Sequence, residues 1–462
     1  MGLCLRNCLC IVLIATAAVG GVSSNHGVFS VKYRYAGRER SLSLLKEHDA
    51  RRQLRILAGV DLPLGGTSRP DGVGLYYAKI GIGTPPKDYY VQVDTGSDIM
   101  WVNCIQCKEC PRRSSLGIEL TLYDIKDSST GKFVTCDQEF CHGVYGGPLT
   151  DCMANTSCPY LEIYGDGSST TGYFVQDVVQ YDKVSGDLQT TSTNGSLIFG
   201  QSGNLDSTNE EALDGIIGFG KSNSSMISQL ASSGGVRKMF AHCLDGINGG
   251  GIFAIGHVVQ PEVNKTPLVP NHINMTAVQV GLDFLNLPTD VFGVGDNKGT
   301  IIDSGTTLAY LPEMVYEPLV SKIISQQPDL KVHTVHDEYT CFQYSESVDE
   351  GFPNVTFHFE NSVSLKVYPH EYLFPFEDLW CIGWQNSGMQ SRDRKNMTLL
   401  GDLVLSNKLV LYDLENQVIG WTEYNYSFLT KVKNLNLIND IYGLFQALQA
   451  LKCGMNGLEQ FI

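Results

Sequence analysis

The chain has 462 residues, which is too long for one ordinary hydrophobic core. Of these residues 43% are hydrophobic and 10% aromatic, a composition that excludes a disordered chain. Its 33 Lys and Arg against 49 Asp and Glu give a net charge of −16, which argues against nucleic acid as a partner. Many short runs rich in Val, Ile, Tyr and Thr, punctuated by 48 glycines, predict a mostly β protein with two large lobes.

The first 24 residues predict a signal peptide. Arg6 supplies a positive charge, residues 8–19 form an apolar core, and small residues follow up to Ser24. A membrane anchor is the alternative, but a bilayer span needs about 20 apolar residues. We therefore expect entry into the secretory pathway. The extracellular space or cell wall, the vacuole and a membrane-associated form stay open as final locations.

Residues 25–70 predict a prosegment. The first 70 residues hold ten Lys and Arg against four Asp and Glu, so the remainder carries 23 − 45 = −22. A basic leader can pair with an acidic body at neutral pH and leave it in acid, because acid protonates the carboxylates. The body is expected to follow as an N-terminal lobe over 71–268 and a C-terminal lobe over 269–427, with an extension over 428–462.

Cysteine usage agrees with export. Three of the fourteen cysteines lie in the predicted signal peptide, and seven of the other eleven crowd between Cys104 and Cys158. This density favours disulfides formed in an oxidising compartment. The spacing of Cys104, Cys107 and Cys110 also fits a zinc site, but no fourth ligand is evident, so we expect no metal.

Eight N-x-S/T sequons behind a signal peptide favour N-glycosylation. They begin at Asn155, Asn194, Asn223, Asn264, Asn274, Asn354, Asn396 and Asn425.

Two copies of one motif organise the body. A predicted hairpin over residues 80–93 leads into Asp94-Thr95-Gly96-Ser97, and another apolar run leads into Asp303-Ser304-Gly305-Thr306. Each copy is followed later in the chain by two apolar residues and a glycine, at Ile216-Ile217-Gly218 and at Leu399-Leu400-Gly401. The distances along the chain from each Asp to its later glycine are similar, 218 − 94 = 124 and 401 − 303 = 98 residues. An ordered pair of motifs that occurs twice predicts two related lobes facing each other.

A lone Asp-Ser/Thr-Gly is an ordinary turn, but two copies point to catalysis by Asp94 and Asp303. Two carboxylates within about 3 Å hold one proton between them, because both cannot ionise. The ionised one can take a proton from a water while the other donates to the carbonyl oxygen under attack. This chemistry needs no metal and no other cofactor.

The body resembles the pepsin family of aspartic proteases, and within it the plant nepenthesin-like branch. The resemblance covers residues 75–421 and rests on the strings DTGSDIMWVNC, YGDGSSTTGYF, LDGIIGFG, IIDSGTTLAYLP and LLGDLVLSNKLVLYDLENQVIGW. It implies a bilobal pepsin-like acid protease fold, two β lobes related by a pseudo-twofold axis, with the active-site cleft between them. It also implies an aspartic endopeptidase with an acidic pH optimum. We expect a monomer that acts on polypeptide substrates.

The resemblance assigns roles to the two motif copies. Their aspartates bind the attacking water, the last hydroxyl of each copy hydrogen-bonds the outer carboxylate oxygen, and the middle hydroxyls tie the two loops together. The residues are, in that order, Asp94 and Asp303, Ser97 and Thr306, and Thr95 and Ser304, with Gly96 and Gly305 lining the site.

Tyr164 lies in a Tyr-Gly-Asp-Gly string that matches the flap of this family. A flap closes over the substrate and excludes water. Trp101 would be its neighbour in the opposite wall. An ordinary hairpin turn and a core aromatic are the alternatives for these two residues.

By the same resemblance the disulfides are Cys104–Cys107, Cys136–Cys158, Cys141–Cys152 and Cys341–Cys381, a pairing that the sequence alone could not choose. Cys110, Cys243 and Cys453 then lack their customary partners. We expect one or three free thiols, with Cys110 free in either case.

A catalytically inactive pepsin-fold protein, either an inhibitor or a storage or lectin-like binding protein, is the alternative function. Such relatives typically lose an active-site Asp or a surrounding motif residue, whereas both motifs and Tyr164 stand intact here. In the extension, residues 438–451 place apolar side chains at helical spacing and predict an amphipathic helix. Lys452 and Glu459 weaken a lipid-anchor signal, so membrane attachment stays open.

Overall fold

The computed structural model describes residues 57–424, apart from short gaps at 71–73, 108–109, 154, 166, 185–189, 207–212, 235, 259–262, 270–271, 289, 293–297, 337–338 and 390–394. The predicted signal peptide, the prosegment up to residue 56 and the predicted C-terminal helix lie outside the described residues. Over the described ranges, no helix is both long and apolar enough to span a bilayer.

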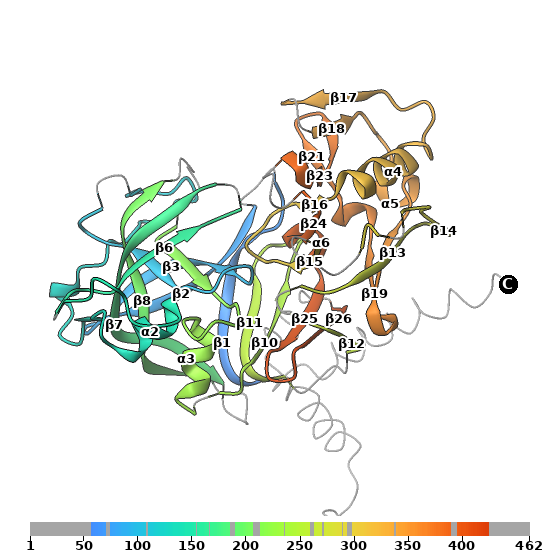
Figure 1. The fold of residues 1–462 in the computed structure, drawn as a ribbon. Helices are drawn as coiled ribbons and strands as arrows, with labels where there is room; N and C mark the ends of the chain where they lie inside the picture. Colours follow the sequence, from blue (N-terminus) through green and yellow to red (C-terminus); the bar gives the residue numbers. More distant parts are fainter. Residues whose placement is uncertain are drawn as a thin grey trace, which may run out of the picture. The chain divides into compact units, whose positions relative to one another are not determined.

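Strands dominate the described chain, as the sequence predicts, and fourteen of them form one continuous sheet (Figure 1). In hydrogen-bonded order they are β12 (Lys265–Pro267), β26 (Val418–Glu423), β25 (Lys408–Asp413), β10 (Met239–Leu244), β11 (Gly251–Val258), β1 (Leu57–Thr67), β2 (Leu75–Ile82), β3 (Lys87–Asp94), β9 (Gly215–Gly218), β4 (Trp101–Asn103), β8 (Thr190–Asp206), β7 (Ser169–Val184) and β5 (Lys132–Phe133), with β6 (Pro159–Ile163) beside β7.

Three four-stranded sheets come from the second half of the chain. They are β14 (Asp283–Phe284), β13 (Met275–Val280), β19 (Val355–Phe359) and β20 (Ser364–Val367); β15 (Gly299–Ile302), β24 (Met397–Leu400), β16 (Ala309–Leu311) and β23 (Trp384–Asn386); and β17 (Val332–Val335), β18 (Tyr339–Phe342), β22 (Leu379–Ile382) and β21 (Leu373–Phe376).

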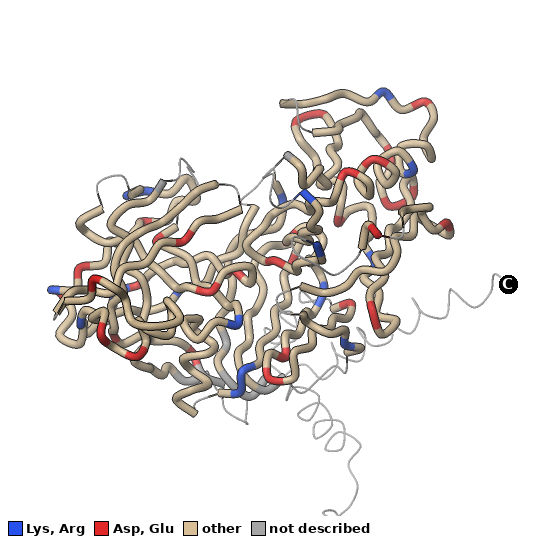
Figure 2. The backbone as a smooth tube through the Cα atoms, viewed as in Figure 1, with Lys and Arg blue, Asp and Glu red and all other residues tan. Residues whose placement is uncertain are grey.

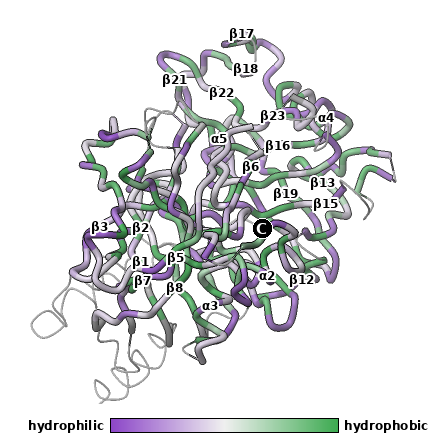
Figure 3. The backbone as a smooth tube through the Cα atoms, turned by 60° about the vertical axis from the view of Figure 1, so that its left-hand side comes forward, coloured by the Kyte–Doolittle hydropathy of each residue, from purple (hydrophilic) through white to green (hydrophobic). Residues whose placement is uncertain are grey.

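The helices are short and lie between the strands. The α-helices are α2 (Glu139–Tyr145), α3 (Met226–Ser232), α4 (Glu313–Ile324), α5 (Val348–Gly351) and α6 (Asp402–Leu405), and the 3-10 turns are η1 (Ile125–Asp127), η2 (Glu360–Ser362), η3 (Pro369–Glu371) and η4 (Ser387–Met389). Hydrophobic stretches run through the packed strands, while outlying loops are mostly hydrophilic (Figure 3).

The hairpin that the sequence predicts over residues 80–93 is confirmed. Strands β2 and β3 pair antiparallel, with Ile80 opposite Tyr89 and Ala78 opposite Val91. These four side chains are buried, each at 1% exposure or less. Alternate residues of a strand face one side of the sheet, so every second position supplies the core. The hairpin therefore holds the end of β3, and with it Asp94, on a rigid support.

The same local topology occurs around both motif copies. Strand β3 pairs in parallel with β9, which pairs antiparallel with β4. Strand β15 likewise pairs in parallel with β24, which pairs antiparallel with β16. The later apolar-apolar-Gly strings are thus the partner strands of the two Asp strands. This explains the repeat in the sequence.

The predicted boundary at residue 71 between prosegment and body falls after the first strand of the large sheet. Strand β1, within the predicted prosegment, pairs with β11 from Leu57 to Leu64 and with β2 from Leu64 to Thr67. Val60 and Leu62 are 2% and 1% exposed. Sequence reasoning missed this strand because its partner β11 lies almost 200 residues away (251 − 57 = 194).

The large sheet crosses the predicted boundary between the lobes, which lies between residues 268 and 269. Strands β25 and β26 fall in the predicted C-terminal lobe, but β25 pairs with β10 in the large sheet. One buried ion pair also joins this sheet to η3, because Lys408 Nζ of β25 lies 2.7 Å from Glu371 Oε2. Both side chains are 2% exposed or less.

Replacing Lys408 with Met is expected to lower the free energy of unfolding by about 3–5 kcal/mol, because it leaves the Glu371 carboxylate buried without its cation. Denaturant unfolding measures this loss. Lys331→Met removes the same charge at an exposed position and should change stability by less than about 0.5 kcal/mol. A loss at Lys408 below about 1 kcal/mol would contradict the prediction.

Three of the four expected disulfides are wrong. The structure pairs Cys107–Cys110, Cys136–Cys152 and Cys141–Cys158, and only Cys341–Cys381 matches the expectation. Strand register explains why Cys136 does not bond to Cys158, because the bridge between Thr135 and Ser157 sets Cys136 opposite residue 156. Cys158 then lies two residues out of register with Cys136.

The resemblance implies that Cys104 is disulfide-bonded and Cys110 free, and the structure shows the reverse. Cys104 continues β4, with its N–H donating to the Ser202 carbonyl at 3.1 Å, and its buried thiol is free. Cys110 is bonded to Cys107, at a Cα–Cα distance of 5.5 Å that suits a disulfide. The expectation that Cys110 is free is therefore wrong. Cys453 lies outside the described residues.

Candidate active site

The two motif aspartates lie at the ends of equivalent strands. Asp94 ends β3 and Asp303 directly follows β15, and they are 6% and 8% exposed. The loops approach each other closely: a Cβ added to Gly96 would lie 2.7 Å from the Asp303 carboxylate, and one added to Gly305 would meet Asp94 Oδ1. Any side chain at these two positions would displace a carboxylate, so glycine is required.

The hydrogen bonds of the two carboxylates match pairwise. Gly96 N donates to Asp94 Oδ1 at 2.8 Å, and Gly305 N donates to Asp303 Oδ1 at 2.8 Å. The hydroxyl of Ser97 donates to Asp94 Oδ2, and Thr306 Oγ1 donates to Asp303 Oδ2 at 2.7 Å. The structure thus brings together the six motif residues that the sequence predicts around the dyad.

Two hydroxyls cross between the loops. Thr95 Oγ1 donates to the Ile302 carbonyl at 3.2 Å and accepts from Ser304 N at 2.9 Å. In the opposite direction, Ser304 Oγ donates to the Val93 carbonyl at 3.1 Å. These are the contacts that the resemblance implies for Thr95 and Ser304. They fix the separation of the two carboxylates, because each loop is bonded to the strand that carries the other.

Burial and mutual repulsion keep a proton on the pair. Burial, and next the neighbouring Asp303 carboxylate, raise the pKa of Asp94 above its ordinary value, against the opposing hydrogen bonds from Ser97 and Gly96. Two adjacent carboxylates cannot both ionise at low cost. The arrangement therefore presents one acid and one base at the same place.

A third carboxyl lies beside the pair, and sequence reasoning missed it. Asp402 begins α6, is fully buried, and has no hydrogen-bond partner on either carboxyl oxygen within the described part of the chain. Burial, and next the charges of Asp303 and Asp94, raise its pKa well above the ordinary range. The signal in the sequence is its position directly after Leu399-Leu400-Gly401.

Tyr164 follows β6 at the tip of a hairpin whose second strand is β7. Its hydroxyl accepts a hydrogen bond from Trp101 Nε1 at 2.6 Å, so the two predicted neighbours do meet. Burial, and to a lesser extent Asp94, raise the pKa of Tyr164 above its ordinary range. The tyrosine is therefore a neutral hydrogen-bonding group near the dyad.

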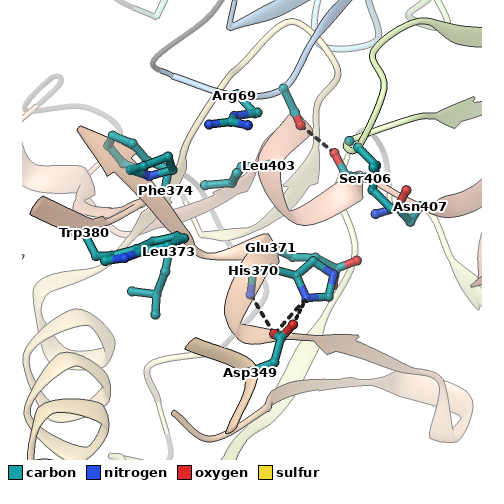
Figure 4. A pocket seen from close by; sticks show the side chains of 14 residues that line it. Arg69, Asp349, His370, Glu371, Leu373, Phe374, Trp380, Leu403, Ser406 and Asn407 are labelled. Carbon is teal, nitrogen blue, oxygen red and sulfur yellow. Dashed lines mark hydrogen bonds and ion pairs between the residues drawn. The ribbon is translucent and has the colours of Figure 1, made fainter. Parts of the chain in front are cut away.

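A separate cavity of about 400 Å³ contains none of the predicted site residues (Figure 4). Phe374, Trp380 and Leu403 supply apolar walls, and Arg69 lies at its edge. His370 Nδ1 lies 2.8 Å from Asp349 Oδ1 on another side. Among the described residues, no group of three or more His, Cys, Asp or Glu side chains could hold a metal ion.

The described sequons differ in accessibility. Five asparagines are exposed and two are half-buried, of which Asn274 donates to Glu360 Oε1 at 2.7 Å. The exposed ones are Asn155, Asn194, Asn223, Asn264 and Asn396, the other half-buried one is Asn354, and Asn425 lies outside the described residues.

Comparison with known proteins identifies the family. Two family models match the body, "Xylanase inhibitor N-terminal" over residues 76–257 and "Xylanase inhibitor C-terminal" over 272–423. Aspartic proteinase 36 of Arabidopsis thaliana is 48% identical over 456 residues, covering 97% of this chain and 94% of that protein. The chain belongs to the plant family of pepsin-like aspartic proteases.

Two further comparisons support the family and the fold. Aspartic proteinase nepenthesin-2 of Nepenthes gracilis is 27% identical over 387 residues, or 80% of each chain, which supports the nepenthesin-like resemblance. The crystal structure of basic 7S globulin from soybean matches with a TM-score of 0.60 at 20% identity, covering 79% of this chain and 96% of that one. That likeness supports the bilobal pepsin-like fold, and nothing beyond the fold.

Proposed function

We propose that the protein is an active aspartic endopeptidase, which hydrolyses peptide bonds with a water activated between Asp94 and Asp303. One observation carries the proposal: two buried carboxyls face each other with the same set of hydrogen bonds. The ionised carboxylate takes the proton of the water, and the protonated one donates to the carbonyl oxygen of the substrate. Relatives named aspartic proteinases agree with this chemistry.

The alternative is an inactive protein of the same fold. The family models take their description from xylanase inhibitors, and a shared fold does not imply a shared function. The intact pair of hydrogen-bonded carboxyls favours the protease, because a binding protein needs no such pair.

We also propose that the protein works in the secretory pathway and that the basic leader before β1 inhibits it at neutral pH. Acidic residues are scattered over the described body (Figure 2), so a basic segment would find carboxylate partners there. Acid would protonate those carboxylates and release the leader.

Purified, acid-treated protein is expected to cleave an unstructured protein substrate fastest in acid and to lose activity toward about pH 8. The sign follows from the pair, because activity needs one shared proton and that proton leaves as the pH rises through the raised pKa of Asp94. A peptide mimic with a hydroxyl in place of the attacking water should inhibit. Activity that peaks at about pH 8 and resists this mimic would refute the mechanism.

A further inference from the structure

Glu162 is part of the hairpin that carries Tyr164. It belongs to β6 two residues before Tyr164, and residues two apart in a strand share a face. On this face Tyr160 is buried and Tyr164 bonds to Trp101. The opposite face carries Leu161 and Ile163, which are 60% and 62% exposed. The Glu162 side chain therefore points to the same side of the hairpin as Tyr164, whose pKa the nearby Asp94 charge helps to raise.

The Glu162 carboxyl is half-buried and, among the described residues, has neither a hydrogen bond nor an ion pair. Its charged neighbour is Asp98, which directly follows the Ser97 that holds Asp94. Burial, and next Asp98, raise the pKa of Glu162 to about 7. A carboxyl in this position is costly to ionise until a cation arrives.

Asp98 already has compensating partners, whereas Glu162 has none. Ser222 N donates to Asp98 Oδ1 at 2.8 Å, and the Asp98 charge acts on the nearby Lys221 and Lys238, whose pKa values burial lowers. Neither lysine contributes to the pKa of Glu162. Among the described residues, no Lys, Arg or His side chain forms an ion pair with Glu162.

We propose that Glu162, with Asp98 beside it, lines a substrate subsite that accepts a Lys or Arg side chain of the polypeptide. This inference rests on the proposed function, because it places the substrate under the flap that covers Asp94. The ammonium or guanidinium group would lie beside the unpaired Glu162 carboxylate. Its aliphatic stem would pack under the hairpin.

The subsite makes the preference for a basic residue depend on pH. In acid Glu162 is neutral, so a substrate cation gains little there; as the pH approaches its pKa of about 7, the ionised carboxylate becomes available. The other groups that face it do not reverse this trend. Tyr160 and Tyr164 have pKa values raised by burial and stay neutral, and Asp98 adds negative charge.

The test compares peptides that are identical except for Lys or Met at one position, scanned through the four positions on each side of the cleaved bond. At one of these positions the ratio of kcat/KM for the Lys peptide over the Met peptide should rise about tenfold between about pH 4 and about pH 6.5. The titration of the dyad cancels in this ratio, because both peptides meet the same enzyme. Glu162→Gln should remove the rise, and Glu139→Gln, which removes an exposed carboxylate of α2, should keep it.

The outcomes separate the two proposals. A wild-type enzyme that cleaves the peptides with a Lys/Met ratio independent of pH, or a Glu162→Gln enzyme that keeps the rise, would overturn the subsite and leave the protease standing. A wild-type protein that cleaves none of the peptides would overturn the proposed function, and the subsite with it.

Discussion

Replacing either Asp94 or Asp303 with Asn is expected to lower kcat/KM by at least about 10³-fold, with the fold retained. Neither carboxyl can perform both proton transfers alone, and Asn has nearly the same shape but cannot exchange a proton. The hydrogen bonds from Gly96 and Gly305 can still be accepted by an amide oxygen, so the loops should keep their structure. Peptide cleavage in acid measures the loss, and thermal unfolding checks the fold.

Asp329→Asn is the matched control, because it removes a carboxylate from an exposed position of the same half of the chain as Asp303. It should leave cleavage unchanged. Residual activity of either dyad variant within about tenfold of wild type, equivalent to about 1.4 kcal/mol of barrier, would show that the two carboxyls do not carry the reaction.

A chain that starts at Gly72 is expected not to fold, although the sequence alone suggests a prosegment that ends at Pro70. It lacks β1, which pairs with β11 and β2 in the middle of the large sheet. The loss exposes the backbone edges of both neighbours and removes Val60 and Leu62 from the core. Each of these side chains contributes about 1.5–3 kcal/mol on burial. Together they supply about 3–6 kcal/mol, a large part of the roughly 5–15 kcal/mol that stabilises a typical domain, before the lost strand pairing is counted.

The matched comparison is a chain that starts at Gln53, since it keeps β1 and lacks most of the predicted leader. It should show a cooperative unfolding transition, whereas the shorter chain should show none. Equal melting temperatures for the two chains would mean that β1 is dispensable. If β1 is required, the cut that releases the leader falls before Leu57.

The sequence by itself determined the features that depend on local pattern. The alternation of apolar residues specified the hairpin of β2 and β3, and the repeated Asp motif specified both carboxyls and their neighbouring hydroxyls. The hydrogen bonds that each Asp carboxyl accepts come from residues two or three positions further along the chain, so the four-residue motif contains every partner. The apolar-apolar-Gly string that follows each motif predicted two related lobes, and the structure shows that these strings form the parallel partners of the two Asp strands.

Tertiary structure decided what depends on register and on distant neighbours. The disulfides changed partners because the bridge of Thr135 to Ser157 shifts Cys136 away from Cys158, which cysteine spacing does not reveal. Strand β1 is part of the body because it pairs with β11, which lies far along the chain. Asp402 and Glu162 are ordinary acidic residues in the sequence, and only the elements packed around them bury their carboxyls and raise their pKa values. Burial is a property of the assembled chain, and the chemistry of a carboxyl follows from it.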